Sequence, residues 1–576
     1  MIQERYKLWA ENPYFDEETR AELSRLQDPK EIEDRFYTDL EFGTGGLRGI
    51  LAAGRNRMNK YVVRKVTQGL ADLIAEYGQR GRERGVVIAY DSRRFSPEFA
   101  REAALVLARN GIKAYLFESL RPTPELSFAV RHLHTLAGIV ITASHNPKEY
   151  NGYKVYWEDG GQVPPEQANR ILAKIQERED WLGIEPLAED EARRQKLLVM
   201  IGEEIDRAYL KKVQTLSIHP ELNLKSGNKL KIIYTPLHGA GTMLVRKALA
   251  QAGFHSVFVV PEQEKPDSEF TTVPFPNPEI PSTFDLARSY ALEQGADLIL
   301  ATDPDADRLG VAVRAGDGSY VQLTGNQAGV ILMHYILGQK QALGTLPAKA
   351  AVIKTIASTD LADEVARSFK VKVENVLTGF KFIAEKVHEM EEEGWGQFQF
   401  GFEESYGYLA GTFVRDKDGI IAAVLLAEAA LYYKINGGRT LLDVIEDIYT
   451  RFGYYIEDQK SFTLEGIEGK EQMAKIMHHL RSLEFREIGG IPVERIDDYE
   501  QRFGKRWETG EVSILTLPRS DVLRFSFRGG GFVMARPSGT EPKIKFYFSI
   551  KEEKREGLEE TLQRVKEDIL ARVQEV

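Results

Sequence analysis

The sequence predicts an α/β protein of several domains that ends in a smaller α+β domain. A chain of 576 residues exceeds the size at which one hydrophobic core stops growing, so about three to five domains are expected. Segments typical of strands and helices alternate in three successive blocks, and such alternation predicts parallel α/β layers. After Gly529 the pattern changes to strand-like segments followed by one long charged helix.

The first block begins with a short apolar strand at residues 86–90. Ser96 is a typical helix N-cap with Pro97 behind it, and Gly111 ends the predicted helix. A strand, a helix and a strand then follow at 112–117, 124–133 and 137–142. The second block has the same order, with strands at 229–234, 256–260 and 297–302 and helices at 242–253 and 285–295.

The third block has predicted strands at 351–354, 371–376 and 397–401, with helices at 359–369 and 380–393. The last part of the chain has an alternating strand at 543–550 and an amphipathic helix at 554–573. Residues 180–225 and 454–515 are more polar and less regular, so we expect linkers there. No residue-by-residue repeat connects the blocks; only the order of elements recurs.

Composition excludes several classes of protein. The hydrophobic and charged fractions, 43% and 28%, are those of ordinary soluble proteins. The longest apolar run, 420–431, is too short for a membrane span and contains Glu428. No cysteine is present, which removes disulfides, thiolate catalysis and cysteine-based zinc sites. A net charge of −11 argues against a general nucleic-acid binder, and the N-terminus has no apolar signal segment. We expect a cytoplasmic protein.

Each α/β block ends in a strand that leads into a polar loop. Ligands gather at the carboxyl ends of strands in open α/β sheets, so the three loops predict one shared cleft. The first loop contains Ser144, His145 and Asn146. A serine presented there can carry a phosphate that backbone N–H groups and the histidine support. The alternative is an ordinary turn formed by Ser and Asn next to Pro147.

The second loop contains Asp303, Asp305 and Asp307 at alternate positions after an apolar strand. Three carboxylates repel one another unless a cation or a basic neighbour compensates them, and together they can hold one hard cation through oxygen ligands. A calcium-binding EF-hand needs Gly and Glu where this chain has Arg308 and Arg314, so that alternative fails. A phosphate on the first-loop serine would supply a further oxygen ligand. A solvated acidic turn stays open as the alternative.

Three further loops have residues suited to a sugar phosphate. Residues 536–543 combine two cations, two hydroxyls and a glycine, a composition suited to holding phosphate. Residues 401–407 place two carboxylates and a hydroxyl between glycines, and carboxylates accept hydrogen bonds from sugar hydroxyls. The turn at 43–49 is rich in glycine and contains Arg48. Each of these loops can also be an ordinary surface loop.

Together these motifs resemble those of the α-D-phosphohexomutase superfamily, in the family's order and over nearly the whole chain. The resemblance implies four domains around a central cleft: three related α/β domains with mixed sheets and a smaller C-terminal α+β domain. It implies a phosphoserine domain at 1–215, a metal-binding domain at 216–322, a sugar-binding domain at 323–455 and a phosphate-binding domain at 456–576.

The resemblance also implies a role for each motif residue. Ser144 would carry the phosphoryl group, and one Mg²⁺ would bridge it to Asp303, Asp305 and Asp307. Arg48, His145 and Lys154 would support proton transfer and the moving phosphoryl group, and which of them is the acid or base stays open. The residues expected to bind substrate are Arg308, Thr378, Gly379, Lys381, Glu403, Ser405, Arg536, Ser538, Gly539 and Thr540.

The length, the Phe-Glu-Glu-Ser-Tyr-Gly loop and the segment 415–419 resemble the phosphoglucomutase-2 and phosphopentomutase-like branch. This implies interconversion of glucose 1-phosphate and glucose 6-phosphate, with glucose 1,6-bisphosphate as intermediate and activator. Pentose and mannose phosphates are the next choices, and a metal-dependent sugar phosphatase or a silent sugar-phosphate binding protein are further alternatives. We expect a small-molecule sugar phosphate as partner, no nucleic acid, no membrane, and a monomer or weak homodimer.

Overall fold

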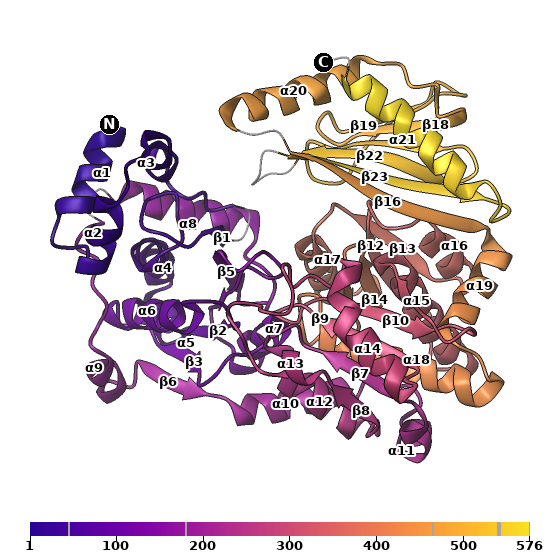
Figure 1. The fold of residues 1–576 in the computed structure, drawn as a ribbon, viewed down its shortest axis with the longest axis horizontal. Helices are drawn as coiled ribbons and strands as arrows, with labels where there is room; N and C mark the ends of the chain where they lie inside the picture. Colours follow the sequence, from indigo (N-terminus) through magenta and orange to yellow (C-terminus); the bar gives the residue numbers. More distant parts are fainter. Residues whose placement is uncertain (44–45, 179–180, 464–465, 538–542, 575–576) are drawn as a thin grey trace. The chain divides into compact units, whose positions relative to one another are not determined.

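The computed structural model describes residues 1–43, 46–178, 181–463, 466–537 and 543–574 (Figure 1). The chain forms two compact units. The first comprises Met1–Thr324, Val387–Glu389 and Ser405–Gly437, and the second comprises Gly325–Lys386, Met390–Glu404 and Gly438–Val576.

The first sheet of the first unit has the strand order β1-β5-β4-β2-β3-β6. β4, β2, β3 and β6 run parallel, whereas β5 and β1 are antiparallel to their neighbours. The strands are β1 (Gly46–Ile50), β2 (Val86–Tyr90), β3 (Ala114–Phe117), β4 (Ala137–Ile141), β5 (Tyr150–Trp157) and β6 (Leu198–Ile201). Strands β2, β3 and β4 were predicted; β1, β5 and β6 were not.

Helices of the first unit cover this sheet with their apolar faces. Side chains from the helices at 60–75, 96–109, 165–177 and 189–194 share one buried core with the strands, in which Val63, Leu107 and Ile139 are fully inaccessible to solvent. The helices are α4 (Lys60–Ala75), α5 (Gly78–Arg84), α6 (Ser96–Arg109), α7 (Thr123–Leu133), α8 (Pro165–Glu177) and α9 (Glu189–Arg194). Pro97 lies in the first turn of α6, as its sequence predicts.

The second sheet has the order β11-β10-β9-β7-β8. β8, β7 and β9 are parallel, and β10 and β11 add antiparallel strands at one side. The strands are β7 (Ile232–Thr235), β8 (Val257–Val259), β9 (Leu298–Thr302), β10 (Leu309–Arg314) and β11 (Tyr320–Leu323). The helices of this part are α10 (Glu203–Gln214), α11 (Pro220–Ser226), α12 (Gly241–Gln251), α13 (Pro261–Glu264) and α14 (Asp285–Gln294). The loop with the three aspartates connects β9 to β10.

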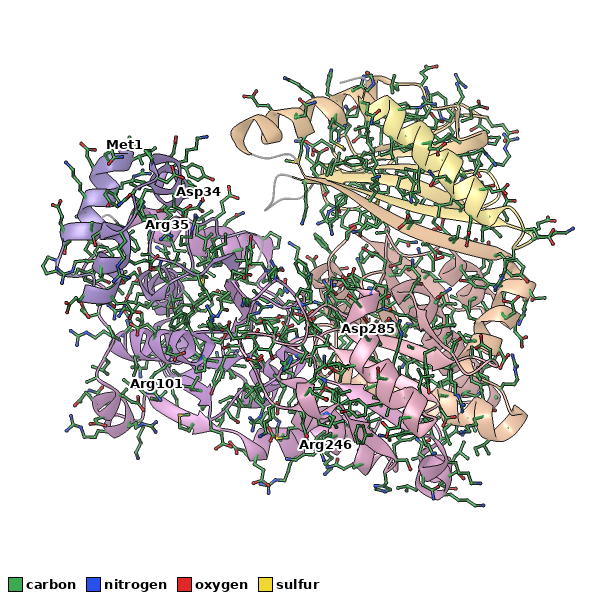
Figure 2. All side chains as sticks on the ribbon, in the orientation of Figure 1. Met1, Asp34, Arg35, Arg101, Arg246 and Asp285 are labelled. Atoms are coloured by element: carbon green, nitrogen blue, oxygen red, sulfur yellow. The ribbon has the colours of Figure 1, made fainter. Side chains whose placement is uncertain are left out.

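Three N-terminal helices carry a separate aromatic core. Trp9, Phe15 and Tyr61 pack with ring centroids 4.3 to 5.8 Å apart, and Trp9 is 1% exposed. Arg35 on α3, labelled with its neighbour in Figure 2, donates a hydrogen bond to the carbonyl of Ala53 at 3.1 Å and so ties α3 to the loop before α4. The helices are α1 (Ile2–Glu11), α2 (Glu17–Ser24) and α3 (Pro29–Phe36).

Replacing Trp9 by Ala should destabilise the first unit by about 3–5 kcal/mol, because it leaves a large cavity in a packed aromatic core. Thermal or urea unfolding followed by tryptophan-independent circular dichroism measures the loss. Trp395, which lies in the second unit with a lysine over its ring, is the matched control, and its replacement by Ala should cost less. Equal losses for the two variants would contradict the importance of this core.

Helix α18 (Gly419–Gly437) is long and apolar enough to cross a membrane by length and composition. In this fold it is a core helix, since 72% of its apolar window is buried. Asp418 caps its start, accepting hydrogen bonds from the backbone N–H groups of Ile420 at 2.9 Å and Ile421 at 2.8 Å. The hydroxyl of Tyr209 donates to the same carboxyl at 2.7 Å.

Burial raises the pKa of Asp418 from 3.8 to about 7. A carboxyl with a raised folded-state pKa stabilises the fold at low pH, and this contribution is lost as the pH rises from about 4 to about 7. Asp418→Asn keeps the capping oxygen without the titration. The stability of this variant relative to the wild type should therefore increase across that pH window. Unfolding midpoints of both proteins at each pH measure the difference, and a difference independent of pH would contradict the assignment.

The second unit contains a parallel sheet in which β12 pairs with β13 on one side and β14 on the other. These strands are β12 (Ala350–Thr355), β13 (Lys372–Val376) and β14 (Gln397–Glu403), close to the predicted bounds. Its helices are α15 (Gly325–Ala342), α16 (Leu361–Ser368), α17 (Phe380–Glu393) and α19 (Leu441–Phe452). The short strand β15 (Gly407–Leu409) belongs to the first unit.

An antiparallel sheet forms the C-terminal part, in the order β16-β23-β22-β21-β18-β19-β20. Its members are β16 (Tyr454–Thr463), β17 (Glu487–Ile488, paired to β18), β18 (Ile491–Asp498), β19 (Phe503–Arg506), β20 (Val512–Ile514), β21 (Leu523–Phe527), β22 (Gly531–Pro537) and β23 (Lys543–Glu552). Helices α20 (Gly466–Ser482) and α21 (Leu558–Gln574) accompany it. The fold class is confirmed: three α/β sheets and a smaller α+β domain.

The expectation of linkers in the polar segments was wrong for most of their length. Residues 454–515 form β16, α20 and four further strands, and residues 189–226 form α9, β6, α10 and α11. In residues 454–515 the antiparallel strands are mostly half-buried or exposed, and a polar exposed face makes such strands resemble loops.

Candidate functional site

Ser144 lies on the loop that follows β4, in the left-handed backbone region with φ of +53°. Its backbone N–H donates to the hydroxyl of Thr142 at 2.8 Å, which fixes the turn. Its hydroxyl donates to Oδ2 of Asp303 at 2.8 Å and lies 3.1 Å from Nδ1 of His145. The predicted serine and the first aspartate therefore meet directly, although 159 residues separate them.

A buried arginine fixes the backbone of the serine loop. The guanidinium of Arg93 is inaccessible to solvent and donates to four backbone carbonyls of this loop, those of Ser144, Asn146, Pro147 and Tyr150. The carboxylate of Asp91 lies 3.3 Å from Nε of Arg93 and accepts hydrogen bonds from the hydroxyls of Thr142 at 2.6 Å and Ser96 at 2.8 Å. This network over-determines the position of the serine, which allows its strained φ.

Arg93→Lys should lower kcat about 10²-fold, because a lysine cannot reach four carbonyls at once and a misplacement of about 1 Å at a reacting group has that effect. The charge opposite Asp91 is kept, so the fold should persist. Initial rates together with an unfolding midpoint separate the two effects. The matched control is Arg131→Lys, at a half-buried arginine that donates to the carbonyl of Asp159. A kcat for Arg93→Lys equal to that of this control would contradict the prediction.

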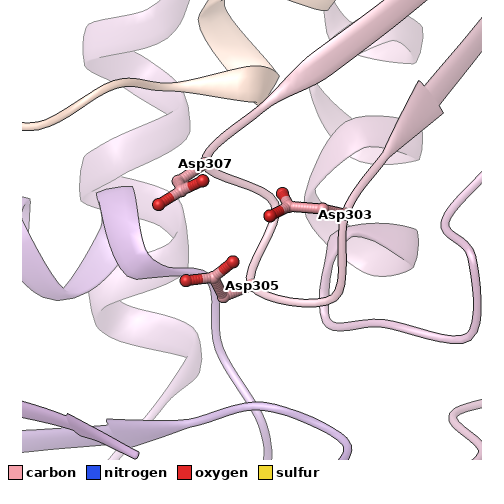
Figure 3. Close-up of side chains that lie close together, drawn as sticks. All are labelled: Asp303, Asp305 and Asp307. Carbon is pink, nitrogen blue, oxygen red and sulfur yellow. The ribbon is translucent and has the colours of Figure 1, made fainter. Parts of the chain in front are cut away.

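Asp303, Asp305 and Asp307 converge on one point, as Figure 3 shows. All three are fully buried, and one carboxylate oxygen from each lies within 4.8 Å of the others. Oδ1 of Asp305 and Oδ1 of Asp307 are buried, and they have no hydrogen-bond partner within the described parts of the chain. Unpartnered buried carboxylate oxygens are costly, and a hard divalent cation such as Mg²⁺ satisfies them through oxygen ligands. The residues present fit such an ion.

Basic side chains surround this triad. Nζ of Lys154 on β5 lies 2.9 Å from Oδ2 of Asp305 and 3.5 Å from Oδ2 of Asp307. Nζ of Lys417 lies 2.9 Å from Oδ2 of Asp307 on another side. The backbone N–H of Arg308 donates to Oδ1 of Asp303 at 3.1 Å, and its guanidinium contacts Glu279.

Burial raises the pKa of Asp303 well above its usual value, and the neighbouring carboxylates of Asp305 and Asp307 act in the same direction. Burial alone would lower the pKa of Lys154, but the carboxylates of Asp305 and Asp307 outweigh burial and raise it. The lysine is therefore charged. The raised pKa of Asp303 reflects its loss of solvent together with the negative charge of its two neighbouring carboxylates.

His145 and Arg48 complete the cluster around the serine. Burial lowers the pKa of His145 well below 6.5, and the positive charges of Arg308 and Arg48 act in the same direction. The imidazole is therefore neutral at neutral pH and can exchange a proton with the serine oxygen. Arg48 on β1 donates to Oδ1 of Asn146 at 2.8 Å, next to the serine.

The other predicted substrate residues belong mainly to the second unit. The hydroxyl of Thr378 is buried without a hydrogen-bond partner among the described residues, and Gly379 adopts φ of +120°, which favours glycine. Burial lowers the pKa of Lys381, and the positive charge of Arg536 acts in the same direction. Ser405 belongs to the first unit. Ser538, Gly539 and Thr540 lie outside the described residues.

Two adjacent carboxylates, Glu403 and Glu404, lie at the end of β14. Burial raises the pKa of Glu404 to about 7, and the charge of Glu403 adds to this shift. The hydroxyl of Thr355 donates to Glu404 at 3.0 Å, and the charge of Arg536 reaches both Glu404 and Tyr547. In the second unit, carboxylates and cations thus lie within electrostatic reach of one another.

Sequence reasoning missed three residues that contact this machinery: Arg93, Lys417 and Thr123. Lys417 lies in a run of four charged residues that composition assigns to the surface, yet all four are buried. The long apolar helix that follows directly could have indicated that this charged run is buried. Residues that precede the start of a core helix are themselves close to the core. The sequence around Thr123 indicates only the start of a helix, because a proline follows it. Nothing in it indicates a contact with the aspartates.

Comparison with known proteins places these features in a family context. Models of phosphoglucomutase/phosphomannomutase α/β/α domains I, II and III match residues 39–181, 207–316 and 324–452. A phosphoglucomutase from Staphylococcus saprophyticus is 38% identical over 546 residues, covering 95% of this chain and 96% of the relative. One from Staphylococcus epidermidis is 39% identical over 536 residues, covering 93% and 95%.

Solved structures share the fold. The phosphoglucomutase parafusin from Paramecium, in its open form, has a TM-score of 0.68 at 18% identity, covering 93% of this chain and 95% of that one. A phosphoglucomutase/phosphomannomutase family protein from Burkholderia thailandensis has a TM-score of 0.66 at 17% identity, covering 93% and 97%.

Proposed function

Because the chain belongs to the phosphoglucomutase/phosphomannomutase family, we propose that it interconverts glucose 1-phosphate and glucose 6-phosphate through a phosphoserine at Ser144. The observation that carries this proposal is the 2.8 Å contact between the Ser144 hydroxyl and Asp303, inside a buried triad with two unpartnered oxygens. The phosphoglucomutases to which the chain is 38–39% identical support the choice of glucose phosphate.

In this proposal the phosphoryl group moves from Ser144 to the free hydroxyl of the sugar monophosphate, which forms glucose 1,6-bisphosphate. The sugar hydroxyl loses its proton as the new O–P bond forms, the bond between phosphorus and the Ser144 oxygen breaks, and that oxygen takes up one proton, so the serine hydroxyl is restored. The intermediate turns over, and its other phosphoryl group returns to the serine. Bound Mg²⁺ would neutralise phosphoryl charge in this step. Lys154 and Arg48 supply further positive charge, and neutral His145 is 3.1 Å from the oxygen that gains or loses the bond.

The remaining predicted substrate residues would hold the sugar and its unreactive phosphate. We propose that Glu403 and Ser405 accept and donate hydrogen bonds to its hydroxyls, and that Thr378, Gly379 and Lys381 line the same site. Arg536, with Ser538, Gly539 and Thr540, would bind the phosphate that does not react. The domain boundaries at 215, 322 and 455 belong to this proposal.

The test is incubation of the purified protein with glucose 1-phosphate, Mg²⁺ and a trace of glucose 1,6-bisphosphate. Glucose 6-phosphate without free phosphate supports a mutase. Free phosphate and glucose would contradict it in favour of a phosphatase. Comparing kcat/KM for glucose, mannose and ribose 1-phosphates, each with its own bisphosphate, then ranks the sugars. A higher kcat/KM for mannose or ribose 1-phosphate would overturn the choice of glucose.

A further inference from the structure

Thr123, at the start of α7, contacts the central aspartate of the triad through two separate groups. Its side chain is fully buried. The hydroxyl donates to Oδ2 of Asp305 at 2.9 Å, and the backbone N–H donates to the carbonyl oxygen of the same aspartate, also at 2.9 Å. One residue thus fixes both the backbone and the side chain of Asp305, although 182 positions separate them.

The two oxygens of the Asp305 carboxylate have different surroundings. Oδ2 accepts hydrogen bonds from Thr123 and from Lys154, each at 2.9 Å. Oδ1 is buried and has no hydrogen-bond partner among residues whose placement is described. A carboxylate with both donors on one oxygen cannot rotate about its Cβ–Cγ bond without breaking them. Oδ1 is therefore held in one position, and the carboxylate stays in a triad whose ligand oxygens, one from each aspartate, lie within 4.8 Å of one another.

Contacts that do not involve the triad of Asp303, Asp305 and Asp307 also hold Thr123 in place. Arg121, two residues earlier, donates from Nε and Nη2 to the two carboxylate oxygens of Asp206 on α10, at 2.8 and 3.2 Å. The backbone N–H of Arg121 donates to the carbonyl of Tyr90 at the end of β2. The first turn of α7 is thus fixed to the first sheet, so the threonine is a rigid reference point.

We infer that Thr123 is a positioning residue that orients Asp305 for a divalent cation. The inference rests on the proposed function, since it requires Asp305 to be a metal ligand. Hydrogen bonds from residues behind a ligand fix its orientation, and removing them typically weakens metal binding about 10–100-fold. Lys154 can also hold Oδ2, but its flexible ammonium does not fix the carboxylate plane as a buried hydroxyl on a helix start does.

The experiment measures the dissociation constant of Mn²⁺ by electron paramagnetic resonance on the full-length protein, with the phosphorylation state verified by mass spectrometry. Thr123→Val has nearly the same shape and lacks the hydroxyl. Its dissociation constant should rise about 10–100-fold, whereas Thr123→Ser should stay close to the wild type. Thr123→Ala gives a second hydroxyl-free variant if valine prevents folding, as judged by circular dichroism.

The matched control is Thr135→Val, at another fully buried threonine, whose hydroxyl donates to the carbonyl of Ala137 at 3.0 Å and does not touch the triad. Unchanged Mn²⁺ affinity in both hydroxyl-free variants at position 123 overturns the inference, and so does equal weakening in Thr135→Val. Asp305→Asn tests the underlying proposal separately. If that variant binds Mn²⁺ as the wild type does, the metal site itself is wrong, whatever Thr123 does.

Discussion

Ser144→Ala should abolish turnover of glucose 1-phosphate, with kcat reduced at least about 10⁴-fold, as expected for loss of a covalent nucleophile. Alanine has no side-chain oxygen at this position, so the atom that would carry the phosphoryl group, 2.8 Å from Asp303 in the wild type, is lost. The fold should be preserved. The hydroxyl that fixes the turn belongs to Thr142 and accepts the backbone N–H of residue 144, so it survives the substitution.

Initial rates in a glucose 6-phosphate dehydrogenase-coupled assay measure the loss, and mass spectrometry after incubation with glucose 1,6-bisphosphate should show a phosphoryl adduct on the wild type alone. Ser127→Ala is the matched control. Its hydroxyl is also buried in the same unit, donates to the carbonyl of Gly160 at 2.6 Å and accepts a hydrogen bond from the backbone N–H of Arg415 at 2.8 Å. A Ser144→Ala variant with the activity of this control would disprove the phosphoserine route.

The α/β blocks could be predicted because their strands are buried on both faces and their helices carry one apolar face. Residues 86–90 and 298–302 are short apolar runs bounded by turn signals, and both form central strands. The antiparallel strands of residues 454–515 escaped prediction because most of their described side chains are half-buried or exposed, which leaves few buried apolar positions to mark a strand. Val512 and Ile514 are even largely exposed, 64% and 82%, so hydrophobicity carries no core signal there.

In the candidate site, too, some residues could be predicted from the sequence and others could not. Ser144 and the three aspartates could be predicted because each follows a strand and each residue type has a specific chemistry. Arg93 and Thr123 could not, because an arginine that binds backbone carbonyls and a threonine that orients a carboxylate have no local pattern. Their roles depend on contacts with residues that are distant in the sequence. The structure brings Ser144 and the aspartates together, and the roles of all the predicted site residues stay predictions.

Charge at the triad explains why removing the metal should stop the reaction without unfolding the protein. Three carboxylates carry a charge of −3 when ionised, and the ammonium groups of Lys154 and Lys417, 2.9 Å from Asp305 and Asp307, offset two of these. The metal-free site therefore has a small net charge and is tolerated. A phosphoryl group on Ser144 adds a charge of about −1.5 to −2. This additional negative charge lies close to Asp303, because the serine oxygen contacts that carboxylate. Neutralising it requires about two further positive charges, which one divalent cation supplies.

Treatment with a chelator should therefore abolish turnover, and added Mg²⁺ should restore it, while the protein stays folded throughout. The free energy of unfolding with Mg²⁺ should exceed that without it only by the contribution of binding. This contribution is about 2.7 kcal/mol when the Mg²⁺ concentration is 100 times the dissociation constant. Asp307→Asn should weaken Mg²⁺ binding and lower kcat, because it removes an unpartnered ligand oxygen and the negative charge that lies 2.9 Å from Nζ of Lys417. Asp297→Asn, at a carboxylate that binds Lys434 at the other end of β9, is the control and should behave as the wild type. Turnover that resists the chelator would show that the aspartates do not hold a catalytic cation.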